Sequence, residues 1–104
     1  ILGTFNHWNA IEVTGRGTNI SDERLVHKVE VVQKAMDVNH PDPKDGLDVL
    51  AKVGGFEFGC LTGVILGAAA HHAMTIIDGF NTTASAFIAK ALAPQVTDYL
   101  APVA

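Results

Sequence analysis

Apolar residues recur at helical spacing in the first half of the chain. After residue 21, four of them follow one another at intervals of four, three and four residues: Leu25, Val29, Val32 and Met36. This is the spacing of one face of an α-helix. Ser21 is a typical N-cap residue, and Asp22 and Glu23 fall in a first turn, where the helix dipole favours acidic side chains. The pattern predicts an amphipathic helix that ends before Asn39.

Two further helices are predicted in the middle of the chain. Asp42 and Pro43 have the order of an N-cap followed by a first-turn proline, and Gly54 would end that short helix. Residues 56–72 are nearly all apolar and predict a longer helix. Its uncharged part, 58–70, is too short to span a membrane, which takes about 20 apolar residues, so we expect a buried core helix.

Three glycines lie on one face of the predicted long helix, because Gly59, Gly63 and Gly67 follow at intervals of four residues. Each glycine costs about 1 kcal/mol relative to alanine in a helix interior. Such a face either allows another backbone or a flat ligand to approach closely, or is a packing face that happens to be rich in glycine and alanine. The sequence leaves both interpretations open.

A strand, a turn and a helix are predicted over residues 74–92. The β-branched run before Asp78 predicts a buried strand, and Gly79 allows a sharp turn. Three residues after the turn are N-cap types: Asn81, Thr82 and Thr83. The carboxyl end of a strand in an open α/β sheet is where ligands bind, and the free N–H groups of a helix N-terminus suit an anion.

The remaining segments predict an incomplete α/β domain. Residues 1–10 are expected to be irregular, 12–19 to form a loop, and 100–104 to carry no closing element after a last turn at 96–100. About four helices and one strand result. A lone parallel-type strand cannot satisfy its backbone groups, so its partners are expected outside this chain or in another copy of it. The chain starts without methionine, and we expect residues 1–104 to be a fragment or a processed product forming one incomplete α/β domain.

Composition and charge narrow the function classes. The net charge of −4 and the scattered basic residues argue against nucleic acid as a partner. Cys60 is the single cysteine, which excludes an intrachain disulfide and fits a reducing cytosol; we expect it to be buried. His71 and His72 are adjacent and would diverge by about 100° on a helix, so no metal site is predicted. No signal peptide is expected.

A glycine-rich loop before the first long helix is a candidate anion site. Gly15, Arg16 and Gly17 would let backbone and guanidinium approach a phosphate at the helix N-terminus, and Lys28 would add a point charge. The alternatives are a plain turn and a solvated lysine paired with a nearby acid. Asp78, likewise, would either hold the Gly79 turn or contact a ligand.

Several ordered blocks resemble nicotinate-nucleotide–dimethylbenzimidazole phosphoribosyltransferase, an enzyme family of cobalamin biosynthesis. The blocks are Val13–Thr18, Leu47–Glu57, Leu61–Ala70 and Ile77–Phe80 followed by a Thr/Ala-rich helix. The resemblance runs from about Ala10 to Leu100. It implies a helix-rich portion of a Rossmann-like parallel-sheet domain, from the central or C-terminal part of the catalytic domain of a cytoplasmic, homodimeric transferase that needs no cofactor.

The resemblance also implies a reaction and a set of substrate-binding residues. Members transfer phosphoribose from nicotinate mononucleotide to 5,6-dimethylbenzimidazole, giving α-ribazole 5′-phosphate and nicotinate. By position, four residues would lie near the nucleotide phosphate: Gly15, Arg16, Gly17 and Lys28. Gly79, with Asp78 beside it, would line the ribose–nicotinate pocket. No catalytic residue is assigned, because the family's catalytic glutamate is expected beyond Ala104.

Two other interpretations stay open at this point. The chain would be a truncated, non-catalytic module that binds a nucleotide or dimerises, or an unrelated α/β protein that carries the motifs by chance. If the chain is a phosphoribosyltransferase fragment, we expect these 104 residues alone to be inactive, because the catalytic glutamate segment is expected beyond Ala104.

Overall fold

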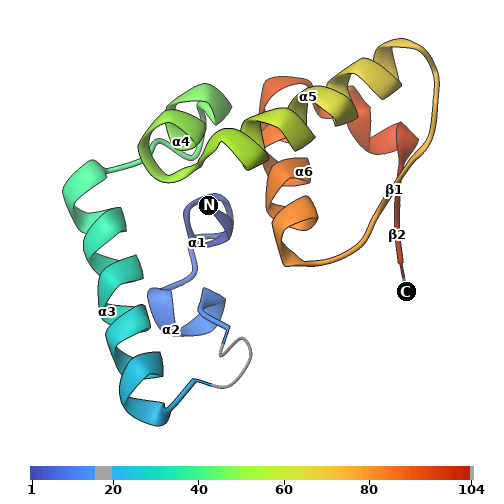
Figure 1. Cartoon of the computed structure of the whole chain (residues 1–104). Coiled ribbons are helices and arrows are strands. Elements are labelled where there is room, and N and C mark those ends of the chain that lie inside the picture. The colour runs from blue at the N-terminus through green and yellow to red at the C-terminus, as the bar shows by residue number, and fades with distance from the viewer. Residues whose placement is uncertain (16–19, 104) are drawn as a thin grey trace.

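The computed structural model describes residues 1–15 and 20–103 and has a helix-rich α/β architecture (Figure 1). The fold class predicted from the sequence is therefore confirmed. The molecule is elongated, with extents of 45 × 28 × 22 Å. Its elements are α1 (Leu2–Asn6), α2 (Ala10–Val13), α3 (Asp22–Asn39), α4 (Gly46–Val53), α5 (Phe56–Ala70), β1 (Thr75–Ile77), α6 (Phe80–Leu92), the 3-10 helix η1 (Pro94–Tyr99) and β2 (Leu100–Pro102).

The C-terminal third is a β-α-β unit. β1 is followed by α6 and η1, and β2 returns parallel to β1 with Thr75 opposite Leu100 and Ile77 opposite Pro102. The N–H of Val103 extends the ladder by donating to the carbonyl oxygen of Ile77 at 3.0 Å. The expectation that β1 has no partner in this chain is wrong, and so is the expectation that residues 100–104 carry no closing element. A strand of three residues containing a proline has too little alternation to be seen in the sequence.

The core lies between α5 and α6. Four buried apolar residues form it, and η1 contributes the last of them: Ile65, Ala86, Ala89 and Val96. Small alanines on α6 let the two helices approach closely. A buried hydrogen bond also joins them, because the hydroxyl of Thr62 donates to the carbonyl oxygen of Ser85 at 3.3 Å. This pairing satisfies a polar group that burial would otherwise leave unpaired.

Helix α4 also packs against α6, where Val49 and Ile88 are fully buried. The helix starts three residues later than the sequence predicts. Asp45, rather than Asp42, is its N-cap and accepts from the N–H of Asp48. Asp42 instead accepts from the N–H of Lys44 in the preceding turn. The prediction at Gly54 is confirmed, since it is the C-cap residue.

The N-terminal region is more regular than predicted. Residues 2–6 form α1, and the ring of Phe5 stacks on Phe87 of α6 with centroids 6.3 Å apart. Residues 10–13 form the one-turn helix α2, which has a capping box between Asn9 and Glu12. The sequence predicts irregular structure for residues 1–10 and a loop for 12–19, so both predictions are wrong where these helices form. Neither helix is long enough to show a period, and tertiary contact decides their conformation.

Helix α3 begins as predicted, with the Ser21 hydroxyl accepting from the N–H of Arg24. It ends at Asn39, one residue later than predicted, and His40 follows in the left-handed region with φ 46°. The predicted apolar stripe of α3 is half-buried. The helix therefore lies along one side of the molecule and is only partly covered (Figure 1).

Much of α5 and β1 is exposed. A Cβ added at Gly63 or Gly67 would meet no atom within 4 Å, whereas one added at Gly59 would contact the side chain of Leu50 at 3.6 Å. No described residue therefore packs on the Gly63 and Gly67 part of that face. Cys60, on α5, is exposed and not buried as expected. Ile76, in a strand expected to be buried, is 69% exposed. Among the described residues, no helix combines the length and hydrophobicity that a membrane crossing demands.

Candidate functional site

The corner between β1 and α6 contains two of the predicted site residues. Gly79 is the N-cap of α6 and has φ 95° and ψ 169°, a conformation that is essentially restricted to glycine. A Cβ added there would meet nothing within 4 Å, so the requirement is conformational and the space in front of the corner is open. Asp78 and Gly79 are both exposed. The predicted strand–turn–helix corner is therefore present at the carboxyl end of β1.

Two threonines of α6 stabilise this corner through hydrogen bonds. The Thr83 hydroxyl donates to the Gly79 carbonyl oxygen at 2.8 Å, and the Thr82 hydroxyl donates to the carbonyl oxygens of Asp78 and Gly79. The prediction of an N-cap at residues 81–83 is wrong, because Gly79 takes that position and no side chain caps the helix. The first-turn N–H groups of α6 thus stay available to an anion.

The second pair of predicted residues meets at the start of α3. The ammonium of Lys28 donates to the carbonyl oxygen of Gly15 at 2.9 Å. This contact ties the lysine to Gly15, the first residue of the predicted glycine-rich loop, and holds its ammonium beside that residue. Arg16 and Gly17, the other two predicted loop residues, lie outside the described residues.

The two pairs lie on different elements, and no hydrogen bond between described residues joins them. A cavity of about 160 Å³ lies next to the β1–α6 corner, lined in part by Ile77, Thr83 and Lys90. Ligand pockets usually measure about 300–1,000 Å³. The described residues therefore do not enclose a pocket of ligand size at this corner.

Histidine and cysteine residues do not form a metal centre in the part of the chain that the structure describes. His72 has φ 58°, and its Nδ1 lies 2.9 Å from the Tyr99 hydroxyl, with the two rings edge to face. This contact joins the end of α5 to η1. It could not be predicted from the sequence because the two residues are far apart in the chain.

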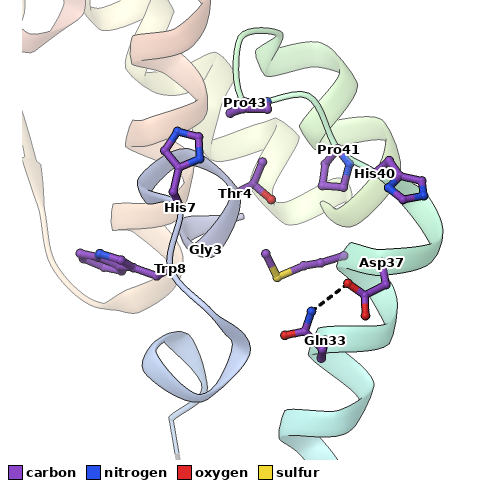
Figure 2. A pocket seen from close by; sticks show the side chains of 10 residues that line it. Gly3, Thr4, His7, Trp8, Gln33, Asp37, His40, Pro41 and Pro43 are labelled. Atoms are coloured by element: carbon purple, nitrogen blue, oxygen red, sulfur yellow. Dashed lines mark hydrogen bonds between the residues drawn. The ribbon is translucent and has the colours of Figure 1, made fainter.

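Another concave surface lies between α1 and α3 (Figure 2). It has a volume of about 460 Å³ and is lined by none of the predicted site residues. The sequence does not predict it, because one of its walls is α1, a segment expected to be irregular.

Comparisons with known proteins agree over nearly the whole chain. A family model described as Phosphoribosyltransferase matches residues 1–103. The chain is 61% identical over 89 residues to the nicotinate-nucleotide–dimethylbenzimidazole phosphoribosyltransferase of Desulforudis audaxviator, covering 86% of this chain and 25% of that protein. It is 45% identical over 100 residues to the protein of the same name from Clostridioides difficile, covering 96% of this chain and 29% of that protein.

A solved structure is also similar. The crystal structure of CobT from Thermus thermophilus superposes with a TM-score of 0.88 at 32% identity, covering 96% of this chain and 30% of that one. The chain thus spans between a quarter and about three tenths of the length of these proteins.

Proposed function

This chain belongs to the nicotinate-nucleotide–dimethylbenzimidazole phosphoribosyltransferase family, and on that premise we propose that it forms part of an enzyme of cobalamin biosynthesis. The enzyme would transfer phosphoribose from nicotinate mononucleotide to 5,6-dimethylbenzimidazole, releasing nicotinate and giving α-ribazole 5′-phosphate. The observation that carries this proposal is the 61% identity to the Desulforudis audaxviator protein, whose name states both substrates. Residues 1–104 would be one portion of a single α/β domain in a cytoplasmic homodimer.

The start of α3 would bind the phosphate of the nucleotide. The bond from Lys28 to the Gly15 carbonyl supports this role, because it keeps an ammonium beside the residue that directly precedes Arg16 and Gly17 in the sequence. A lysine acts on phosphate as a point charge, and an arginine can add a bidentate contact. Holding the phosphate fixes the position of the ribose, which is a large part of catalysis when a C–N bond breaks.

The β1–α6 corner would line the ribose and nicotinate. Three features support it: the glycine-only backbone of Gly79, the open space in front of it and the uncapped N-terminus of α6. Asp78, exposed at the end of β1, would contact the ribose hydroxyls as a hydrogen-bond acceptor. No catalytic residue is assigned within this chain.

Measurements of binding and of turnover test different parts of this proposal. Isothermal titration of the 104-residue chain with nicotinate mononucleotide should show weak binding, and binding of the riboside without phosphate should be weaker still. No α-ribazole 5′-phosphate should form when dimethylbenzimidazole is added, because the chain supplies only one wall of the site. Turnover at a rate typical of enzymes would contradict the assignment of no catalytic residue here.

A matched pair of lysine substitutions tests the phosphate contact. Lys28→Ala should weaken nicotinate mononucleotide binding about tenfold, the effect of losing one charge-assisted hydrogen bond. Lys34→Ala removes another exposed lysine from the same helix and should change the affinity little. Equal effects of the two substitutions would show that Lys28 contributes only long-range charge and would overturn its role as a phosphate ligand.

A non-catalytic dimerisation module is the alternative function. The open part of the α5 glycine face favours it, because Gly63 and Gly67 on an apolar helix would let a second copy approach closely. A chain that dimerises tightly but shows no phosphate-dependent binding would support this alternative over the transferase.

A further inference from the structure

The groove between α1 and α3 has a wall of mixed apolar and polar side chains (Figure 2). The side chains on which the inference rests are Thr4, Gln33, Met36, Asp37, Pro41 and Pro43. Its volume of about 460 Å³ lies within the range of small-molecule pockets. Trp8 also borders the groove, but Figure 2 shows its indole directed away from Thr4 and Asp37.

Thr4 presents a buried hydroxyl without a partner. The residue is 7% exposed, and its Oγ1 has no hydrogen bond in the structure. Figure 2 shows this hydroxyl directed from α1 into the space between α1 and α3. Buried hydroxyls are nearly always paired, so an orphan that lines a groove points to a ligand group that pairs with it.

The charge of the groove is negative. Asp37 accepts from the Gln33 amide nitrogen at 2.8 Å, which orients its carboxylate on the α3 wall. Among the described residues that line the groove, Asp37 alone carries a formal charge when histidine is neutral. Lys52, which donates to the nearby His40 carbonyl oxygen, is neutralised by Asp48 at 3.1 Å.

We propose that this groove binds a small organic cation, a protonated amine or amidine with a compact apolar body. The cation would pair with the Asp37 carboxylate and donate to the Thr4 hydroxyl, while Met36, Pro41 and Pro43 contact its apolar part. A phosphate-bearing ligand is disfavoured by the charge of Asp37, so this site is separate from the nucleotide site proposed above and does not rest on it.

Three probes of one shape test the charge requirement. Benzamidine, benzamide and benzoate are titrated into the 104-residue chain at about pH 8, where an ordinary imidazole is neutral, and amide NMR shifts are followed. Benzamidine should bind about tenfold more tightly than benzamide, because its contact to Asp37 is charge-assisted. Benzoate should not bind. Equal affinity for benzamidine and benzamide, or no shifts around Thr4 and Asp37, would overturn the proposal.

Substitutions on the two walls test the assigned contacts. Asp37→Asn should lower benzamidine affinity to that of benzamide and leave benzamide unchanged. Asp98→Asn removes an exposed carboxylate on η1 and should change neither. Loss of benzamidine preference in both variants would show a general charge effect and overturn the site.

Thr4→Val keeps the side-chain volume and removes the unpaired hydroxyl. It should weaken benzamidine binding, while the urea midpoint of unfolding stays equal or rises because an unpaired buried group is lost. A clearly lower midpoint would show that the hydroxyl is paired within the fold, and would overturn its role as a ligand contact.

Discussion

Gly79 shows how one residue can shape a candidate site without any contact. Its φ of 95° and ψ of 169° form a backbone conformation that other residues rarely adopt, while an added Cβ would meet no atom within 4 Å. Gly79→Ala should therefore lower the free energy of unfolding by about 1–3 kcal/mol through backbone strain alone. Urea denaturation measures this. Gly15→Ala, where the space is equally open and φ is not positive, should stay within about 0.5 kcal/mol.

Asp48 makes a pH-dependent contribution to α4. Its carboxylate accepts from the N–H of Asp42 and pairs with Lys52, and these contacts lower its pKa from the ordinary value of 3.8. A lowered folded-state pKa means that the stabilisation is fully present above pH 3.8 and is lost as the pH falls through the folded pKa.

The substitution Asp48→Asn isolates this contribution. The variant should be less stable than the wild type at neutral pH, and the difference should disappear as the pH falls below the folded pKa of Asp48. Urea midpoints between about pH 2 and 7 measure it. A difference that stays constant over this range would show that Asp48 acts through hydrogen bonds that asparagine also lacks, rather than through charge.

Single-residue predictions succeeded where local chemistry decides the outcome. Ser21 caps α3 and Gly54 ends α4, because capping depends on a residue's own side chain or backbone. Lys28 meeting Gly15 agrees with the expected loop, although the roles of both in binding stay predictions. Thr82 and Thr83 were misassigned because their hydroxyls can donate backward to a carbonyl as well as accept at a cap.

At the scale of elements, replacing glycine by alanine on the open face of α5 should stabilise the chain, whereas most substitutions destabilise a protein. Gly63→Ala and Gly67→Ala should each raise the free energy of unfolding of this chain by up to about 1 kcal/mol, because the added methyl meets nothing and helix propensity improves. Thermal unfolding measured by circular dichroism would show it.

Gly54→Ala is the contrasting substitution. Its Cβ would lie 2.5 Å from the Leu50 carbonyl oxygen, so the end of α4 would have to shift and stability should fall. Destabilisation by Gly63→Ala, together with a loss of dimer in solution, would instead show that the glycine face is covered by a second copy.

Elements whose apolar pattern extends over many residues can be predicted from the sequence. Short elements that are stabilised by contacts with distant residues cannot. Helices α3, α5 and α6 each show their period or apolar run over at least 13 residues. Helix α1 depends on the Phe5–Phe87 stack, and β2 on pairing with β1. Neither contact leaves a signal within five or three residues of local sequence.

At the scale of the whole molecule, the chain is more open than a compact domain. Its radius of gyration is 14.3 Å, against about 13 Å for a compact domain of 100 residues. Phe56 is fully exposed, and Met74 and Ile76 are each 69% exposed. We expect reversible self-association that grows with concentration, since exposed apolar side chains beside an open sheet favour pairing.

Sedimentation velocity over a concentration series measures this association. Ile76→Lys should reduce it, while Val26→Lys, an equally severe change at an exposed site of α3, should reduce it less. A monomer at all concentrations would contradict the expectation and, with it, the predicted homodimer for this chain. The α/β class was visible in the sequence, but this openness was not, because burial of Ile76 depends on neighbours that its own sequence cannot reveal.

Pro102 gives the small sheet a direction of growth. The N–H of Val103 faces β1, where it donates to Ile77, so the preceding position on β2 faces the opposite side. That position is a proline and has no N–H to donate. The outer edge of β2 therefore lacks a backbone donor at Pro102, whereas β1 contains no proline. A third strand would therefore pair with β1 and not with β2, so the sheet would extend at the β1 edge.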